Sequence, residues 1–415
     1  YTRKTSVTEY NGKIIDEKFL AIINPAIIKF KPEAKKSFEE AVESISGYVS
    51  GELKIEKLSE DKCYGIQDKE TAMDFLQQAL DAPRPYIALD SETSALYCRD
   101  GYMLGFSMSY EPDHGVYVDC DIIDEEVEAK MQELFNKKTV VFHNAKFDLQ
   151  WFIYHFNFEF PNFEDTMLMH YMFDENPGTH GLKQLAMNHT PYGDYEKPLE
   201  DWGIEYRRKH GILKEAFSYD LIPFDVMKDY AAMDAVVTFL LYEKMRAAIE
   251  KNSRLLWVYE NILLEGCNFL RQVENNGVPF DRARLEFAQG VMQEDIEKAV
   301  AELYEFPEVR LFEKGQGKDF NPNSTVQLRS LLFDYINLTP TGKKTGTGAH
   351  STDAEVLGQL AEEHAVPKHI LEIRQKNKIK NTYLDKIIPN LDRDSRLRTG
   401  FNLHGTTSGR LSSSG

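Results

Sequence analysis

The spacing of apolar and polar positions predicts a strand-rich first part of the chain and a helical second part. Alternating apolar runs predict strands over residues 86–90, 103–110, 115–120 and 139–142. Apolar positions at helical spacing predict helices over residues 38–48, 69–80, 125–135, 146–156, 165–173, 182–189, 226–249 and 255–274. Strands that alternate with helices are typical of α/β layer structures. We therefore expect an α/β domain over residues 86–250, followed by a mostly helical region.

Helix boundaries in the second half have local markers. Asn276-Gly277 is a good signal for the end of the helix over residues 255–274. Thr352 and Glu355 have the spacing of a capping box ahead of an apolar run. Pro367 is expected to end the helix that this box begins.

The charge of the chain is unevenly distributed. The 415 residues include 49 Lys and Arg against 67 Asp and Glu, a net charge of −18. Taken alone, this charge argues against a nucleic-acid partner. However, residues 86–250 carry a balance of −16, whereas residues 251–415 are neutral. The acidic segment is therefore either a solvated surface or a group of carboxylates that hold cations.

Several classes of protein are excluded by the composition. The sequence has no run of about 18 apolar residues that could span a membrane, and we expect no secretory leader. The four Cys are scattered without a Cys-x-x-Cys pair, which fits a reducing compartment and argues against a disulfide scaffold or a zinc ribbon. We expect a cytoplasmic location and no membrane partner. Because the chain begins at Tyr1 rather than at Met, we also expect it to be part of a longer protein.

The most informative tetrapeptide is Asp90-Ser91-Glu92-Thr93, which follows the apolar run 86–89. The two-residue period of a strand places Asp90 and Glu92 on the same face. Two facing carboxylates repel each other unless a cation lies between them. Mg²⁺ suits such a pair, because it takes carboxylate oxygens and keeps waters that a phosphate can displace. The tetrapeptide is therefore either part of a metal site or a solvated strand end.

Two further segments add polar side chains to this picture. Asp148 is expected in the first turn of the helix after the strand 139–142, where a carboxylate also complements the helix dipole. Tyr230 and Asp234 are four residues apart in a predicted helix and therefore share a face. Taken alone, Asp148 is also explained by this dipole effect, and Tyr230 with Asp234 by an ordinary surface pair on an amphipathic helix.

Taken together and in this order, the three motifs resemble those of the DEDD superfamily of 3′–5′ exonucleases. Tyr230 is typical of the branch in which a tyrosine, rather than a histidine, accompanies the last aspartate. Asp165-Thr166 and the segment 180–186 also look like parts of this family. The resemblance covers about residues 86–250 and implies a ribonuclease H-like mixed sheet flanked by helices.

The resemblance also implies a mechanism and a set of site residues. Two Mg²⁺ ions, with Mn²⁺ or Zn²⁺ as alternatives, would lie about 4 Å apart. The expected ligands, which are also catalytic residues, are Asp90, Glu92, Asp148 and Asp234, and Tyr230 would orient the attacking water. Thr93 and Asn144 are candidates for holding the terminal nucleotide of a single-stranded 3′ end.

The second half resembles the thumb and the entry into the palm of a family A DNA polymerase. The resemblance is carried by the segments 277–281, 320–328, 351–353, 374–383 and 406–413. Residues 368–398 contain nine basic and four acidic side chains, which fits phosphate contacts on a duplex or, alternatively, a solvated helix face. Arg374, Lys378 and Thr382 are the candidate DNA contacts. In the family, the arginine that matches Arg410 lies near the primer terminus; Ser408 stands where the family more often has Thr.

These resemblances predict four regions. Residues 1–85 have no assigned role, residues 86–250 are the exonuclease domain, residues 251–398 are the thumb, and residues 399–415 begin the palm. Because the family's two palm aspartates and its fingers helix do not occur in this sequence, we expect the chain to be the exonuclease–thumb portion of a longer proofreading polymerase, unable by itself to synthesise DNA. We also expect the chain to come from a phage-type replicase.

The expected partners are primer-template DNA, a single-stranded 3′ end and the remaining palm and fingers of the polymerase. A processivity or replisome protein is a further candidate partner. Two alternative functions stay open on sequence grounds. One is a stand-alone DEDD nuclease, and the other is a catalytically silent module that only positions DNA.

Overall fold

The structure is a computed structural model that describes residues 14–15, 19–20, 22, 24–29, 34–49, 58–59 and 61–414. The chain forms two compact units. The first unit comprises Tyr1–Asn275 and Gly400–Gly415, and the second comprises Asn276–Thr399. Each unit has a hydrophobic core of its own.

A six-stranded mixed sheet forms the centre of the first unit, with the strand order β3-β6-β5-β4-β7-β8. β4 lies inside this sheet, antiparallel to β5 and parallel to β7. Ile87, Ala88 and Leu89 of β4 are fully buried, so the acidic residues that follow them extend a strand that is anchored in the core. The strands are β3 (Cys63–Ile66), β4 (Tyr86–Thr93), β5 (Met103–Glu111), β6 (His114–Asp119), β7 (Thr139–Phe142) and β8 (Phe163–Asp165).

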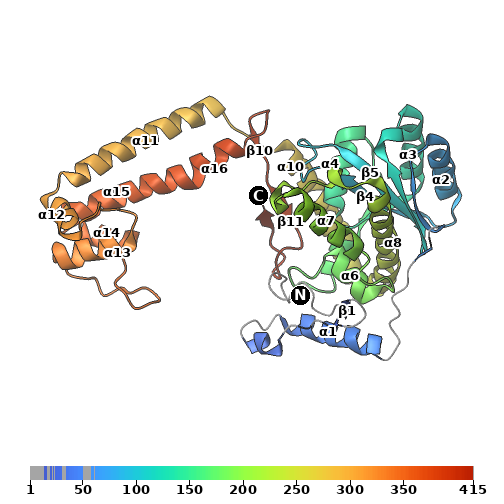
Figure 1. Cartoon of the computed structure of the whole chain (residues 1–415), viewed down its shortest axis with the longest axis horizontal. Coiled ribbons are helices and arrows are strands. Elements are labelled where there is room, and N and C mark those ends of the chain that lie inside the picture. The colour runs from blue at the N-terminus through green and yellow to red at the C-terminus, as the bar shows by residue number, and fades with distance from the viewer. Residues whose placement is uncertain are drawn as a thin grey trace. The chain divides into compact units, whose positions relative to one another are not determined.

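Helices cover both faces of the sheet (Figure 1). α8 contacts β3, β4, β5 and β6, whereas α3 and α4 pack on β7. A Cβ at Gly115 of β6 would lie 2.3 Å from the Ala232 carbonyl oxygen, so glycine at this position allows α8 to approach the sheet closely. The helices are α1 (Ala34–Val49), α2 (Lys69–Asp81), α3 (Glu125–Lys137), α4 (Ala145–Phe156), α5 (Thr166–Tyr171), α6 (Leu182–His189), α7 (Lys197–His210), α8 (Phe224–Ile249), α9 (Ser253–Val258) and α10 (Glu265–Asn276).

Short elements complete the first unit. β11 (Gly400–Asn402) and β12 (Ser412–Ser414) pair with each other, and the Phe401 amide donates a 2.6 Å hydrogen bond to Glu274 of α10. The C-terminal hairpin therefore contacts the helices of the first unit directly. The other short elements of this unit are β1 (Ile14–Ile15), β2 (Phe19–Leu20), η1 (Pro25–Lys29), η2 (Cys120–Ile122), η3 (Lys214–Ala216), η4 (Tyr219–Leu221) and the π-helical turn η5 (Tyr259–Leu264).

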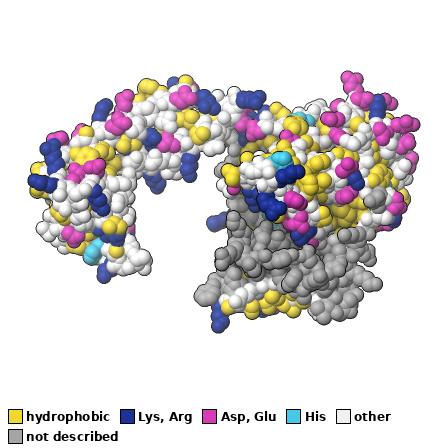
Figure 2. Space-filling view, viewed as in Figure 1, with side chains coloured by type: hydrophobic (Ala, Val, Ile, Leu, Met, Phe, Trp, Pro, Cys, Tyr) yellow, Lys and Arg dark blue, Asp and Glu magenta, His cyan; other side chains and the backbone are white. Residues whose placement is uncertain are grey.

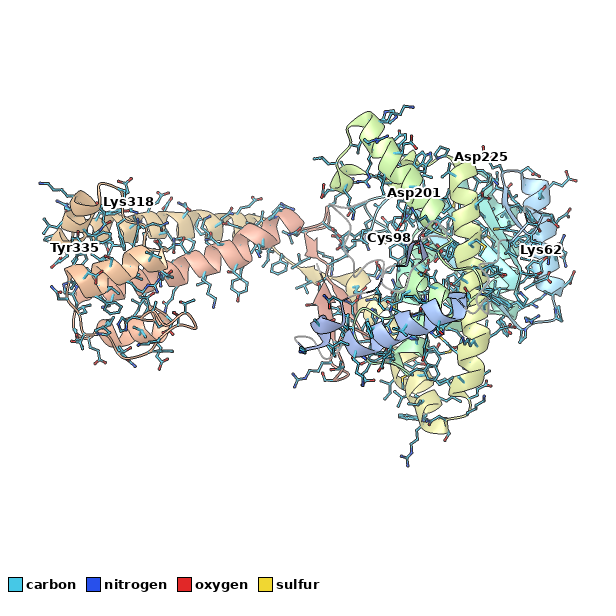
Figure 3. The ribbon with its side chains drawn as sticks, turned by 60° about the horizontal axis from the view of Figure 1, so that its bottom comes forward. Lys62, Cys98, Asp201, Asp225, Lys318 and Tyr335 are labelled. Atoms are coloured by element: carbon cyan, nitrogen blue, oxygen red, sulfur yellow. The ribbon has the colours of Figure 1, made fainter. Side chains whose placement is uncertain are left out.

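The second unit is mostly helical, and its long helices α11 and α15 pack on each other. Its core contains Phe312, against which the ring of Tyr335 packs at a centroid distance of 4.9 Å. Figure 3 labels Tyr335 in this unit. The elements are β9 (Val278–Pro279), α11 (Arg282–Tyr304), α12 (Pro307–Gln316), α13 (Thr325–Arg329), η6 (Ser330–Tyr335), α14 (Ala354–Leu360), α15 (Ala365–Ile379), η7 (Lys380–Leu384), α16 (Asp385–Ile387), η8 (Ile388–Asn390) and β10 (Arg396–Leu397).

The predicted fold class is confirmed: a mixed sheet flanked by helices precedes a helical region. The predicted strands and helices occur, with ends that differ by a few residues. The compact units and the expected domains divide the chain at different positions, because β3 and α2 lie before residue 86 and the first unit continues to Asn275. The four expected domains themselves stay predictions. In the described part of the chain, no helix is both long and apolar enough to cross a membrane.

Two predicted helix boundaries in the second unit are wrong. The residue that caps α14 is Asp353, whose side chain accepts a 3.0 Å hydrogen bond from the Val356 amide, and not Thr352. Pro367 lies in the first turn of α15 and does not end a helix. The first turn tolerates proline because its amides have no partner within the helix.

Candidate metal centre

Three acidic side chains meet where β4 and α8 cross. Asp90 and Glu92 come from β4 and Asp234 comes from α8, and one oxygen of each lies within 4.8 Å of the others. Glu92 and Asp234 are each 4% exposed, and Asp90 is half-buried. Figure 3 labels Asp225 in the first turn of α8, the helix that carries Asp234. The strand and helix periods that the sequence predicted therefore bring the three carboxylates together.

Burial raises the pKa of all three carboxyl groups well above their ordinary values, and neighbouring charges add to this effect. Asp148 raises the pKa of Asp90, and Asp90 raises the pKa values of Glu92 and Asp234. Among the described atoms, Glu92 Oε1 is buried without a hydrogen-bond partner. Such a group of buried carboxylates is unfavourable unless protons or cations neutralise it.

Asp148 lies beside this cluster, in the first turn of α4. It is 1% exposed, and its Oδ1 accepts hydrogen bonds from the Ser91 amide at 2.9 Å and the Ser91 hydroxyl at 2.6 Å. Burial raises the pKa of Asp148 to about 7, although the Ser91 hydrogen bonds oppose this shift. Asp148 is therefore tied to the residue between Asp90 and Glu92, outside the group of three.

Asp165 fixes the start of α4, on which the position of Asp148 depends. Its carboxylate accepts hydrogen bonds from the amides of Asn144 at 3.2 Å and Ala145 at 2.9 Å. The same carboxylate caps α5 through the amides of Met167 and Leu168. Asn144 has a left-handed backbone with φ of 69°, which turns the chain from β7 into α4. Burial raises the pKa of Asp165 to about 6, although the hydrogen bonds from these four amides lower it.

Two tyrosines contact Asp234. Tyr230, one turn earlier on α8, lies close enough to the carboxylate to lower the pKa of Asp234, and the two residues share a helix face as their spacing predicts. Tyr195, in the loop before α7, also donates a hydrogen bond from its hydroxyl to Asp234 Oδ1. The sequence reasoning missed Tyr195, because no periodicity relates it to α8. In the sequence, the only indication of a further site residue was the short polar segment between the helices that contain Leu182 and Lys197.

The candidate substrate contacts have varied surroundings. In the first unit, the Thr93 hydroxyl donates to the Ala95 carbonyl at 2.9 Å, and Arg410 is exposed beside β12. In the second unit, Lys378 and Thr382 are exposed, whereas the half-buried Arg374 guanidinium donates to the carbonyls of Pro322 and Thr352. The assignment of substrate contacts to these residues stays a prediction.

The acidic excess of the first unit has two parts. Asp90, Glu92, Asp148 and Asp234 form the buried part described above. Figure 2 shows many of the other Asp and Glu side chains on the surface over α2 and α3, where Lys69 pairs with Glu126 at 2.5 Å. Most of the net charge is therefore solvated surface, as the first of the two interpretations of the sequence proposed.

Comparison with known proteins identifies the family. A 3′–5′ exonuclease family model matches residues 63–250, and the model for DNA polymerase family A matches residues 290–415. The DNA polymerase of Escherichia phage T5 is 44% identical over 427 residues, which cover 100% of this chain and 50% of that protein. The chain belongs to the family A DNA polymerases. The predicted family is therefore confirmed, and a phage polymerase is among the relatives that the chain matches.

Other relatives support this membership over different lengths of the polymerase chain. The DNA polymerase of Bacillus phage SP01 is 26% identical over 99% of this chain and 51% of its own length. A thermostable DNA polymerase I of Thermus thermophilus is 36% identical over 44% of this chain and 21% of its own length. The chain thus spans about half the length of the phage relatives.

A solved structure shares the fold. The polymerase domain of Pol1 from M. smegmatis, in complex with DNA primer-template and dNTP, superimposes with a TM-score of 0.60. The match covers 84% of this chain and 54% of that structure at 22% sequence identity. At this level of identity the similarity establishes the fold alone.

Proposed function

We propose that the first unit is a 3′–5′ exonuclease that removes terminal nucleotides from single-stranded DNA, and that it proofreads for a family A DNA polymerase. The observation that carries this proposal is the group of three carboxylates within 4.8 Å of one another, two of them buried and Asp90 half-buried, with one Glu92 oxygen that lacks a donor among the described atoms. The match of residues 63–250 to the exonuclease family supports it.

The donor set fits divalent cations. All the candidate ligands are carboxylates, which hard ions such as Mg²⁺ prefer, and a second cation relieves the repulsion that Asp148 adds. We propose two Mg²⁺ ions, with Mn²⁺ or Zn²⁺ as substitutes. Such ions supply an activated water and stabilise the leaving 3′ oxygen. Glu92 and Asp234 would hold one ion together with Asp90, and Asp148 would join Asp90 at the other.

The remaining side chains of the site have supporting roles. The Tyr230 hydroxyl, which lies beside Asp234, would orient the attacking water. Thr93 and Asn144 would hold the terminal nucleotide from the ends of β4 and β7. The exposed Lys378 and Thr382 of the second unit, with Arg410, would contact the primer-template, and Arg374 is the less accessible candidate.

The proposed setting is replication in a bacterial cell infected by a phage, which the phage relatives support. The partners would be the rest of the polymerase and a processivity or replisome protein. A stand-alone nuclease is less favoured, because residues 290–415 match the polymerase family.

The test is hydrolysis of 3′-labelled single-stranded DNA by the full chain in Mg²⁺. Labelled mononucleotide should be released, EDTA should stop the release, and Asp90→Ala should abolish it. Undiminished release by Asp90→Ala would contradict the proposed site. An inactive wild-type chain that still binds DNA would instead favour the silent DNA-binding module.

A further inference from the structure

Asp234 is held from two separate elements of the first unit. Tyr230 lies beside its carboxylate on the preceding turn of α8 and lowers its pKa, and the Tyr195 hydroxyl donates a hydrogen bond to Oδ1 from the loop before α7. The two phenol rings face each other at a centroid distance of 6.4 Å with their planes 23° apart. Because a carboxylate on a single bond can rotate, a second donor from another element fixes an orientation that α8 alone does not determine.

The loop that carries Tyr195 is itself anchored on both sides of that residue. Lys183 of α6 forms ion pairs with Asp194 at 3.6 Å and with Glu196 at 3.0 Å, and it also pairs with Glu200 of α7. One ammonium group therefore ties both neighbours of Tyr195 to α6. This cluster explains how a loop residue presents its hydroxyl to Asp234 in a defined position.

We propose that Tyr195 is a positioning residue of the exonuclease site, which orients the Asp234 carboxylate for a divalent cation. This inference rests on the proposed function. A carboxylate has about four lone-pair sites, so the hydrogen bond from Tyr195 leaves others for a cation shared with Asp90 and Glu92. Partners that hydrogen-bond to ligating carboxylates typically set metal affinity as well as geometry. Tyr195 would therefore act on the cation through Asp234, without touching the scissile phosphate.

The first measurement is metal affinity without DNA. The full wild-type chain and Tyr195→Phe are titrated with Mn²⁺ by calorimetry, because phenylalanine keeps the ring and removes only the hydroxyl. We expect Mn²⁺ binding to weaken about tenfold. The matched control is Tyr110→Phe, which removes a 3.1 Å hydroxyl hydrogen bond to Gln78 of α2, in the same unit but outside the carboxylate cluster, and should leave the affinity unchanged.

The second measurement separates positioning from a loss of structure. With single-stranded DNA, Tyr195→Phe should lower kcat and leave KM for DNA unchanged, and high Mn²⁺ should restore part of the lost rate. In a merely unstable variant, the circular dichroism spectrum of the metal-free chain would show a smaller folded fraction than in the wild type, so this spectrum is recorded beside the rates. Lys183→Met frees the loop but keeps the Tyr195 and Tyr230 hydroxyls, and we expect a smaller loss of Mn²⁺ affinity from it.

The outcomes are distinguishable. If the wild-type chain hydrolyses DNA but Tyr195→Phe binds Mn²⁺ equally well, the positioning role is wrong and the proposed function stands. Tighter binding by Tyr195→Phe would also overturn the inference, because the hydroxyl would then compete with the cation for Asp234. If the wild-type chain neither binds Mn²⁺ nor hydrolyses DNA, the proposed function fails and this inference fails with it.

Discussion

The carboxylates of the first unit and the basic side chains of the second unit are charged groups in opposite situations. Glu92 is buried, the neighbouring charges on it come from other carboxylates, and its Oε1 lacks a partner among the described atoms. In contrast, Lys376 pairs with Glu372 at 2.8 Å and Lys380 pairs with Asp385 at 2.9 Å, all at the surface or half-buried. The first arrangement needs protons or a cation to neutralise it, whereas the second is neutralised by side chains of the chain itself.

Exposed ion pairs and buried unpaired charges differ in free energy, and this difference explains why the carboxylate cluster indicates a function more clearly than the basic helix does. An exposed ion pair is worth about 0–1 kcal/mol, so a DNA phosphate can replace the carboxylate at little cost, but the pair gives no evidence that it does. A buried charge without compensation costs several kcal/mol, so a protein retains a cluster of them only where something neutralises it. The carboxylate cluster therefore supports a specific function, and the basic helix supports only a general one.

The largest expected effect comes from the buried cluster. Glu92→Gln keeps the shape of the side chain and removes a negative charge from the cation site, so exonuclease activity should fall about a thousandfold, which corresponds to about 4 kcal/mol of transition-state stabilisation. The measurement is the rate of mononucleotide release from single-stranded DNA in Mg²⁺. Glu126→Gln, an exposed acid on α3, is the control and should change the rate less than twofold. If Glu92→Gln lowers the rate by less than tenfold, the buried carboxylate matters little more than an exposed one, and the proposed difference between buried and exposed charges is wrong.

The second prediction concerns the stability of the metal-free chain. The folded-state pKa of Asp148 is raised to about 7 from an ordinary 3.8, so its stabilising contribution is present below pH 4 and is lost as the pH rises through 7. In EDTA at pH 8, Asp148→Asn should therefore increase the free energy of unfolding by roughly 3 to 4 kcal/mol, and the increase should shrink as the pH falls towards 5.5.

Urea unfolding followed by circular dichroism measures this difference. Added Mg²⁺ should narrow the difference between the two proteins, because the wild type can bind both cations, whereas the variant keeps only the site of Asp90, Glu92 and Asp234. If Asp148→Asn is less stable than the wild type at pH 8 in EDTA, or if the difference in unfolding free energy does not depend on pH, the charged Asp148 carboxylate does not destabilise the metal-free fold.

The smallest expected effect comes from the basic helix. Lys378 is exposed on α15, so Lys378→Ala should weaken binding of primer-template DNA a few fold. The slope of the logarithm of the binding constant against the logarithm of the salt concentration should become smaller by about one. Fluorescence anisotropy over a range of salt concentrations measures both quantities.

Arg374 provides the contrast within the same helix. Its guanidinium bonds to two backbone carbonyls of the second unit, so Arg374→Ala should reduce stability by about 1–3 kcal/mol rather than change the salt dependence. If Arg374→Ala alters the salt dependence as Lys378→Ala does, the intramolecular contacts of Arg374 are not its main role.

Local spacing predicted the ligands of the site but not what supports them. Asp90 and Glu92 share a strand face, and Tyr230 and Asp234 share a helix face, so short-range periodicity places each pair correctly. Tyr195 reaches Asp234 from a loop far away in the sequence, and such a contact depends on how α6, α7 and α8 pack together.

Asp165 also has a supporting role that local sequence spacing does not reveal. The sequence resemblance marked Asp165-Thr166 as a family feature without giving a reason. The structure supplies one, because the Asp165 carboxylate joins the starts of α4 and α5 and so positions Asp148. Thr352 was favoured as a cap by a short pattern, but the adjacent Asp353 provides the hydrogen bond, because neighbouring capping residues compete for one helix start.

Calorimetric titration of Mn²⁺ into the full wild-type chain and into Asp234→Asn, without DNA, tests the central claim most directly. If the buried carboxylates are a cation site, the wild type should show saturable binding and Asp234→Asn should lose most of it, while both fold with the same circular dichroism spectrum. Identical titration curves for the two proteins would contradict the account, because Asp90, Glu92 and Asp234 would then be held together without a cation.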